Sequence, residues 1–179
     1  ADAGSTDRTR EIAAEYGAVI VEGGIPGIGR NKGAKLAKGD LLVFIDSDVR
    51  FEKDFIELVL SEFKKKKLDF AVPYFYTKNK NPKLSIFFHN ANMYKRIMQH
   101  TRYPDGTGQF FIAKREAFEK LGGYKDYHVA EDTDLVWRAA KKKYKVGTVK
   151  ARFYSSTRRL ERIGVFWTLF VWSIIGVFM

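Results

Sequence analysis

Two carboxylates one residue apart, Asp46 and Asp48, directly follow the apolar run of residues 41–45. Five consecutive apolar residues predict a short strand buried on both faces of a parallel sheet, because a half-exposed strand would alternate. Ligands of open α/β sheets bind beyond the carboxyl ends of the strands, where both side chains would point in nearly the same direction. The pair suits Mg²⁺ or Mn²⁺, which takes further ligands from phosphate oxygens and water. A polar turn that ends a strand explains the same residues without a ligand.

A second acidic group lies much later in the chain, where Glu131, Asp132 and Asp134 open a predicted helix over residues 131–144. The helix dipole favours acids in a first turn, so capping explains some of them without any chemistry. A carboxylate at a helix start that faces a metal and phosphate site is also well placed to act as a general base. Both interpretations stay open at this level.

The elements that must position these acids alternate between helical and extended patterns. This alternation predicts an α/β fold in which a mostly parallel sheet is flanked by helices. Helices are expected at residues 6–16, 30–38, 54–63, 84–100, 115–121 and 131–144. Strands are expected at residues 18–21, 41–45, 68–75, 109–113 and 146–154.

The composition is that of a folded and strongly basic chain. Its 179 residues, 45% of them hydrophobic, can bury one substantial core. The absence of cysteine excludes a disulfide framework, a thiolate zinc site and a cysteine nucleophile. The net charge of +11 predicts attraction to nucleic acid, anionic lipid or phosphorylated ligands, and charge alone does not choose among them.

The end of the chain favours a membrane over nucleic acid as the partner. Residues 163–179 carry no charge and follow Arg158, Arg159 and Arg162. This pattern predicts the start of a transmembrane helix with the preceding region on the cytoplasmic side, and a buried core helix is the alternative. We therefore expect a catalytic domain over residues 1–157, and a basic flank with the start of a transmembrane helix over residues 158–179.

Four segments together resemble family-2 glycosyltransferases, inverting enzymes of the GT-A fold, which is Rossmann-like. Each motif is short, but their order and spacing cover nearly the whole chain before the apolar end. The segments are residues 2–7 (D-x-x-S-x-D), residues 30–40 (A-R-N-x-G…A-x-G), residues 46–48 (D-x-D), and residues 122–132 (G-G-(F/Y)…E-D).

The resemblance implies transfer of a sugar from a nucleotide diphosphate sugar, of the hexosyltransferase type. Asp2 would contact the nucleotide base, and Arg30 would lie near the nucleotide. Asp46 would approach the ribose and assist with the metal, while Asp48 would coordinate the Mg²⁺ or Mn²⁺ that neutralises the diphosphate. A cation there stabilises the charge that develops as the glycosidic bond breaks.

The resemblance also assigns an acceptor side to the site. Asp132 would deprotonate the acceptor hydroxyl, with Glu131 as the alternative base or as its orienting neighbour. Asp105 and Gly106 lie where the family forms its acceptor and donor-sugar pocket. If the acceptor is itself a phosphate, Asp132 would position it instead. The membrane segment makes a lipid-linked acceptor compatible with this reading.

Two departures from the family pattern matter. The family normally begins with a strand and a helix that this chain lacks, so we expect an N-terminally incomplete domain. Processive members carry Q-x-x-R-W after the E-D helix, whereas residues 156–160 read S-T-R-R-L, which favours single transfer. Arg158 or Arg159 would still reach the diphosphate, since arginine suits phosphate oxygens, or would form a basic membrane flank.

Two other classes of protein fit parts of the sequence. Haloacid-dehalogenase-type phosphatases also end an apolar strand with D-x-D, but they expect Thr or Val where this chain has Arg50. A non-enzymatic, membrane-tethered binding module would account for the basic charge, yet it leaves the clustered acids unexplained.

Overall fold

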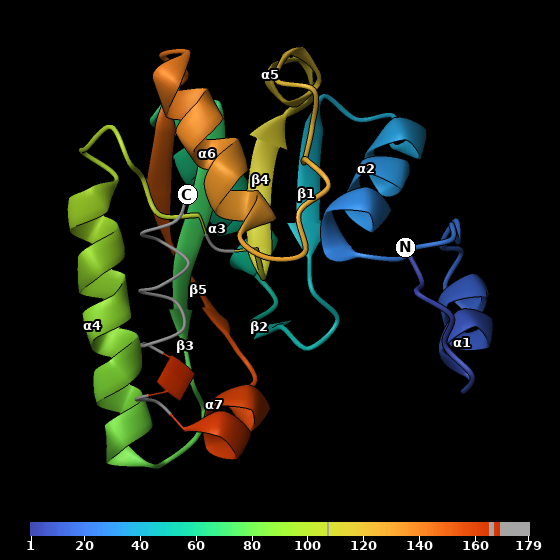
Figure 1. The fold of residues 1–179 in the computed structure, drawn as a ribbon, viewed down its shortest axis with the longest axis horizontal. Helices are drawn as coiled ribbons and strands as arrows, with labels where there is room; N and C mark the ends of the chain where they lie inside the picture. The colour runs from blue at the N-terminus through green and yellow to red at the C-terminus, as the bar shows by residue number, and fades with distance from the viewer. Residues whose placement is uncertain (107, 165–166, 169–179) are drawn as a thin grey trace.

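The computed structural model describes residues 1–106, 108–164 and 167–168 of the chain (Figure 1). Helices and strands alternate along much of it, as the sequence predicts. The helices are α1 (Thr9–Glu15), α2 (Pro26–Leu36), α3 (Phe55–Lys65), α4 (Pro82–Met98), α5 (Arg115–Lys120), α6 (Glu131–Lys141) and α7 (Arg158–Ile163). The strands are β1 (Leu41–Ile45), β2 (Arg50–Phe51), β3 (Phe70–Tyr76), β4 (Phe110–Lys114) and β5 (Val146–Tyr154).

The strands form one mixed sheet in the order β1-β4-β3-β5-β2. Among the described strands, β3 and β5 run parallel, whereas β1 with β4, β3 with β4, and β2 with β5 are antiparallel. The α/β class is confirmed, but the expectation of a mostly parallel sheet is wrong. An apolar run indicates that a segment forms a hydrophobic strand, while the direction of that strand depends on pairing with a segment distant in the chain.

Strand β1 departs from its expected burial in a way that affects the site. Leu42 and Phe44 are buried, but Val43 and Ile45 are 38% and 44% exposed, so burial on both faces is wrong. The strand lies at one end of the strand order and pairs with β4. Asp46 and Asp48 therefore follow an edge strand, where side chains can reach solvent.

The N-terminal segment is attached to the rest of the molecule by sparse contacts. The strand expected at residues 18–21 is not formed, and an isolated parallel bridge joins Asp2 to Glu22 instead. At this bridge the backbone N–H of Asp2 donates a hydrogen bond to Val21 O at 2.9 Å. Helix α1 forms within the expected range but buries no residue, and it stands away from the sheet in Figure 1.

Two apolar clusters cover the two faces of the sheet. Adjacent residues of β4 point to opposite sides, so Phe110 belongs to one cluster and Phe111 to the other. Helices α3 and α4 pack on the Phe110 side, and α5 and α6 pack on the Phe111 side, with α6 lying across the viewer's side in Figure 1. Each fully buried Phe contributes roughly 1.5–3 kcal/mol. The start of α6 is thereby fixed against the sheet.

The predicted membrane segment lies mostly outside the described residues. Helix α7 ends at Ile163, and Gly164 follows with a φ of 88°. Within the part of the chain that the structure describes, no helix is both long and apolar enough to cross a bilayer. The transmembrane helix and the domain division at residue 158 stay predictions.

Candidate active site

Arg30 links three parts of the chain that lie far apart in sequence. Its guanidinium donates to Asp46 Oδ1 at 2.9 Å, to Glu131 Oε1 at 2.5 Å and to Gly108 O at 3.2 Å. These bonds join α2, the turn after β1 and the first residue of α6. The structure thus brings together three residues that the sequence placed in one site, Arg30, Asp46 and Glu131.

The electrostatics of this junction keep Arg30 charged. Burial alone would lower the pKa of the guanidinium, but Tyr124, Asp46 and Glu131 outweigh it and raise that pKa above its ordinary value. The guanidinium carbon also lies 5.5 Å from the centre of the Tyr124 ring. A permanent cation at this point compensates the buried Glu131 carboxylate.

Asp132 lies beside this junction in a partly buried position, with two glycines packed against it. A methyl group added at Gly108 would come within 2.9 Å of Asp132 Oδ2, and one added at Gly106 within 2.7 Å of Asp132 O. Burial, followed by the negative charge of Glu131, raises the pKa of Asp132 to about 6. A carboxylate with this pKa can accept a proton near neutral pH, as a general base requires.

The backbone before α6 is unusual. Ala130 precedes the helix in the left-handed region, with φ 60° and ψ 22°, which non-glycine residues seldom adopt. Such conformations cost about 1–3 kcal/mol and persist where surrounding contacts hold them. Here the contacts of Arg30 with Glu131 and of Gly106 with Asp132 hold the helix start in place.

Asp46 and Asp48 occupy a more open place after β1. Their side chains are 38% and 37% exposed, and Asp48 Oδ2 lies 3.6 Å from Arg158 Nη2. Arg158 is thus beside Asp48, and its contact with a diphosphate stays a prediction. Arg159 also belongs to α7, but its side chain is outside the described part of the structure.

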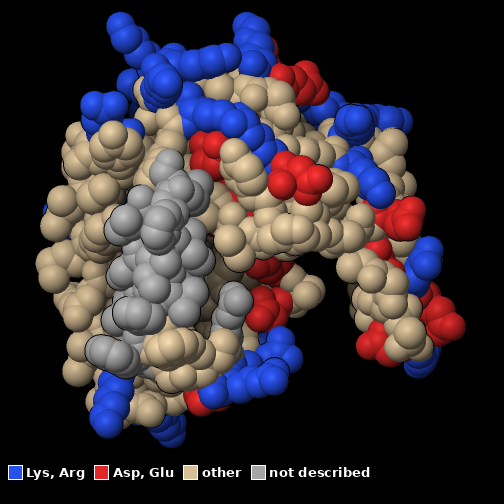
Figure 2. All heavy atoms as spheres, in the orientation of Figure 1, with Lys and Arg blue, Asp and Glu red and all other residues tan. Residues whose placement is uncertain are grey.

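The two carboxylates fit a hard divalent cation, although they form an incomplete set of ligands. Both are oxygen donors that solvent can reach, as Mg²⁺ and Mn²⁺ prefer. Among the described residues, no group of three or more acids or histidines could hold a metal ion. A cation here would take its other ligands from substrate phosphate and water. Figure 2 shows acidic side chains in a hollowed part of the surface, with basic side chains above and below it.

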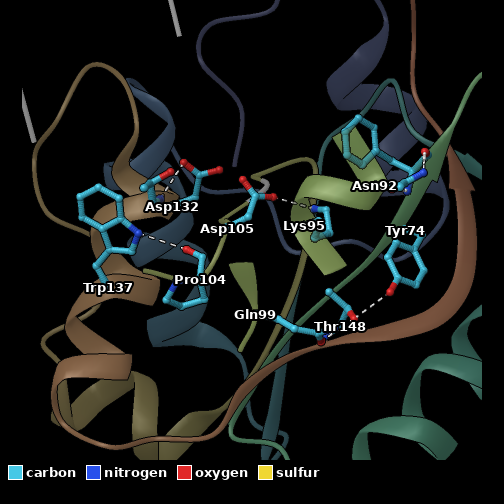
Figure 3. A network of polar contacts seen from close by, with 11 residues as sticks. Tyr74, Asn92, Lys95, Gln99, Pro104, Asp105, Asp132, Trp137 and Thr148 are labelled. Carbon is cyan, nitrogen blue, oxygen red and sulfur yellow. Dashed lines mark hydrogen bonds and ion pairs between the residues drawn. The ribbon is translucent and has the colours of Figure 1, made fainter. Parts of the chain in front are cut away.

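The remaining predicted residues divide between the site and its supports. Asp2 accepts hydrogen bonds from Ser5 and from the Gly4 amide, which lower the pKa of Asp2, and its contact with a base stays a prediction. Gly106 lies against the backbone of Asp132. Asp105 Oδ2 lies 3.1 Å from Lys95 Nζ (Figure 3).

Lys95 is the residue of this region that the sequence analysis missed. It lies on the apolar face of α4, in the same helical rows as Phe88 and Ala91. A lysine at a position that the helical period assigns to the core is a signal that could have identified it.

Comparisons with known proteins identify the family and the fold. The model of the glycosyl transferase family 2 matches residues 1–122. A search of curated proteins finds no match. The solved structures that share the fold include the following three. A mannosyltransferase from Pyrobaculum calidifontis in complex with GDP-Man and Mn²⁺ is 18% identical, with a TM-score of 0.67, over 87% of this chain and 46% of that chain.

The other two come from bacteria. Glucosyl-3-phosphoglycerate synthase from Mycobacterium tuberculosis, in complex with Mn²⁺, UDP and glucosyl-3-phosphoglycerate, is 16% identical with a TM-score of 0.66, over 98% of this chain and 66% of that chain. S. aureus TarS 1–349 in complex with UDP-GlcNAc is 19% identical with a TM-score of 0.61, over 88% of this chain and 48% of that chain. The chain thus spans about half to two thirds of the length of the proteins whose fold it shares.

Proposed function

The chain belongs to glycosyl transferase family 2, and we propose that it transfers a sugar from a nucleotide diphosphate sugar to an acceptor, with inversion and in single transfers. The observation that carries the proposal is the junction at Arg30. It joins the turn of Asp46 to Glu131, directly before the enclosed Asp132. Carboxylates suited to a cation and a carboxylate suited to a proton thereby lie in one site.

The exposed pair, Asp46 and Asp48, would bind the nucleotide diphosphate sugar that donates the sugar. Asp48, assisted by Asp46, would hold Mg²⁺ or Mn²⁺, and Arg158 would add a positive charge beside them. When bound, the cation neutralises the diphosphate that leaves. Two of the similar proteins are seen in complex with Mn²⁺ together with GDP-Man or UDP, which supports this assignment.

The enclosed acid would serve the acceptor. As the acceptor oxygen forms its bond to the anomeric carbon, the bond from that carbon to the diphosphate breaks on the opposite face, and the acceptor proton passes to Asp132. A pKa of about 6 leaves Asp132 mostly unprotonated at neutral pH and still basic enough to share that proton. Glu131 is engaged by Arg30, so it orients the helix start and is a weaker candidate for the base.

We also propose that the protein is bound to a membrane with this domain on the cytoplasmic side, and that a lipid-linked acceptor is used. Support comes from the uncharged run of residues 163–179 after Arg158, Arg159 and Arg162. Recovery of the full-length protein from the membrane pellet after a high-salt wash would agree with this. Complete release by salt would leave attraction by charge alone.

The first test is Mn²⁺-dependent binding of UDP and GDP, measured by calorimetry, in the wild type and in Asp48→Asn. We expect binding that needs the cation, weakens about 100-fold in the variant, and identifies the preferred base. Asp40→Asn is the matched control, because Asp40 is exposed and lies at the opposite end of β1. Release of phosphate from phosphomonoesters without any nucleotide binding would instead favour the phosphatase interpretation.

A further inference from the structure

We propose that Lys95 is a positioning residue for the transfer reaction. Through Asp105 it holds in place the segment that packs against Asp132. This segment consists of Pro104, Asp105, Gly106 and Gly108, and we call it the pocket loop. The proposal rests on the proposed function, because Asp132 must be the group that handles the acceptor. Nothing in the geometry places Lys95 itself on the substrate.

The burial of Lys95 is the first observation. Its side chain is 1% exposed, on a helix face that also buries apolar groups such as Phe88. The ammonium lies 3.1 Å from Asp105 Oδ2 and 4.9 Å from the centre of the Phe75 ring. Burying an ammonium costs several kcal/mol unless a counter-charge compensates it. Asp105 provides that counter-charge, so the position of its loop is tied to the position of Lys95.

Helix α4 is a firm base for this ion pair. One turn before Lys95, Asn92 donates to Phe75 O at 2.8 Å and accepts from Phe75 N at 3.2 Å. One turn after it, Gln99 accepts from the amide of Thr148 at 3.0 Å and from its hydroxyl at 2.7 Å. Lys95 therefore projects from a helix that is hydrogen-bonded to β3 one turn before it and, through the C-cap residue Gln99, to β5 one turn after it (Figure 3).

The pocket loop is also fastened on its other side. Trp137 of α6 donates its indole N–H to Pro104 O at 3.1 Å, next to the ion pair of Asp105 with Lys95. Figure 3 shows the loop residues Pro104 and Asp105 between Trp137 on one side and Lys95 on the other. Two consecutive residues are thus held by two different helices.

The loop then passes directly over Asp132. The backbone of Asp132 leaves no room for a methyl group at Gly106, and the carboxylate of Asp132 leaves little room for one at Gly108. In addition, Gly108 O accepts a hydrogen bond from Arg30. A small displacement of the loop would change the enclosure of the Asp132 carboxylate. Misplacement of a reacting group by about 1 Å can cost about 100-fold in rate. Lys95 thus influences the reaction through the loop.

The test is a double-mutant cycle with Lys95→Met, Asp105→Asn and both changes together, in the full-length protein. We expect each single variant and the double variant to lower kcat by a similar factor, about 10- to 100-fold, because each removes the same tether. The Kd of UDP or GDP with Mn²⁺ should change less than about twofold, since the residues proposed to hold the cation and the nucleotide, Asp46 and Asp48, lie on a different segment of the chain. Hydrogen exchange at the amides of Asp105, Gly106 and Gly108 should accelerate in all three.

The surface pair of Lys114 and Asp69 provides matched controls. Their charged atoms lie 2.7 Å apart, at the end of β4 away from the pocket loop. Lys114→Met, Asp69→Asn and their combination should leave kcat and loop exchange unchanged. Lys95→Arg, which keeps the charge, should recover part of the kcat that Lys95→Met loses.

Several results would overturn the proposal. Wild-type kcat in a folded Lys95→Met/Asp105→Asn protein would do so, as would unchanged loop exchange. The double variant contains no unpaired member of the ion pair, so it serves even if Lys95→Met fails to fold. A wild-type protein that binds no nucleotide would refute the proposed function instead, while the exchange measurement would still report on the tether.

Discussion

Two acidic pairs in this molecule, Asp46 with Asp48 and Glu131 with Asp132, contain the same chemical groups in different surroundings. The first pair follows an edge strand and keeps more than a third of each side chain exposed. In the second pair, Glu131 is 9% exposed and bonded to Arg30, and enclosure raises the pKa of Asp132 to about 6. Arg30 contacts one member of each pair.

The difference indicates how one site can divide two tasks. Exposed carboxylates can exchange water for a cation and its phosphate ligands at low cost. An enclosed carboxylate beside another acid holds its proton more strongly, and this suits proton transfer. The surroundings, and not the residue type, separate the two roles. Five experiments test this separation.

The largest effect is expected for Asp132→Asn. An amide cannot accept the acceptor proton, so kcat should fall about 10²- to 10⁴-fold, while binding of UDP or GDP with Mn²⁺ stays unchanged. Steady-state kinetics and calorimetry measure the two quantities. Asp134→Asn is a suitable control, because Asp134 lies on the same helix and pairs with Arg138 at 2.7 Å. Equal losses in both variants would remove Asp132 from the role of base.

Removal of the divalent cation should act on the open pair. Chelation with EDTA is expected to reduce transfer about 100-fold, because the leaving diphosphate is then not neutralised. Added Mn²⁺ or Mg²⁺ should restore the rate in the wild type and fail to do so in Asp48→Asn. Full activity in EDTA would show that basic side chains such as Arg158 suffice.

Arg30→Gln should cost stability, because it leaves the buried Glu131 without its cation. We expect the free energy of unfolding to fall by about 3 kcal/mol, as measured by urea denaturation. Arg30→Lys should lose less. Arg8→Gln is the control, since Arg8 pairs with Glu11 on the exposed surface of α1, and its denaturation midpoint should not move. An unchanged midpoint in Arg30→Gln would mean that Glu131 is satisfied in another way.

The pH dependence of the rate should follow the enclosed acid. Below about pH 6, Asp132 becomes protonated, so log kcat should fall with a slope of about one per pH unit. The profile is measured between about pH 5 and 8 with saturating Mn²⁺ and donor. An inflection near pH 4 would contradict the enclosure of this carboxylate.

The smallest effect concerns stability and pH. Because the pKa of Asp132 is raised on folding, the folded state binds a proton that the unfolded state has already released between about pH 4 and 6. The contribution of Asp132 to the free energy of unfolding is therefore greatest at low pH and is lost as the pH rises through about 6. Asp132→Asn should be more stable than the wild type by about 1 kcal/mol at pH 8 and should lose that advantage at pH 4. No gain at pH 8 would indicate a solvated carboxylate.

The helical and apolar periods of the sequence predicted most elements near the site. The spacing of Phe55, Val59 and Phe63 indicated α3, and the pattern after Asp132 indicated α6, both close to their observed bounds. The direction of the strands and the exposure of β1 were predicted wrongly. Local patterns report how much of a segment is apolar, whereas strand direction and edge position depend on which distant segment pairs with it.

The sequence by itself determined the chemical groups and their local order, with D-S-D after an apolar run and E-D at a helix start. The tertiary structure alone decided which groups meet, since Arg30 and Glu131 are 101 positions apart and Lys95 reaches Asp105 from a separate helix. It also decided the unequal exposure of the two acidic pairs. The spacing of residues along a helix or strand sets the direction in which their side chains point. The burial and the electrostatic environment of those side chains arise from other elements that pack against that helix or strand.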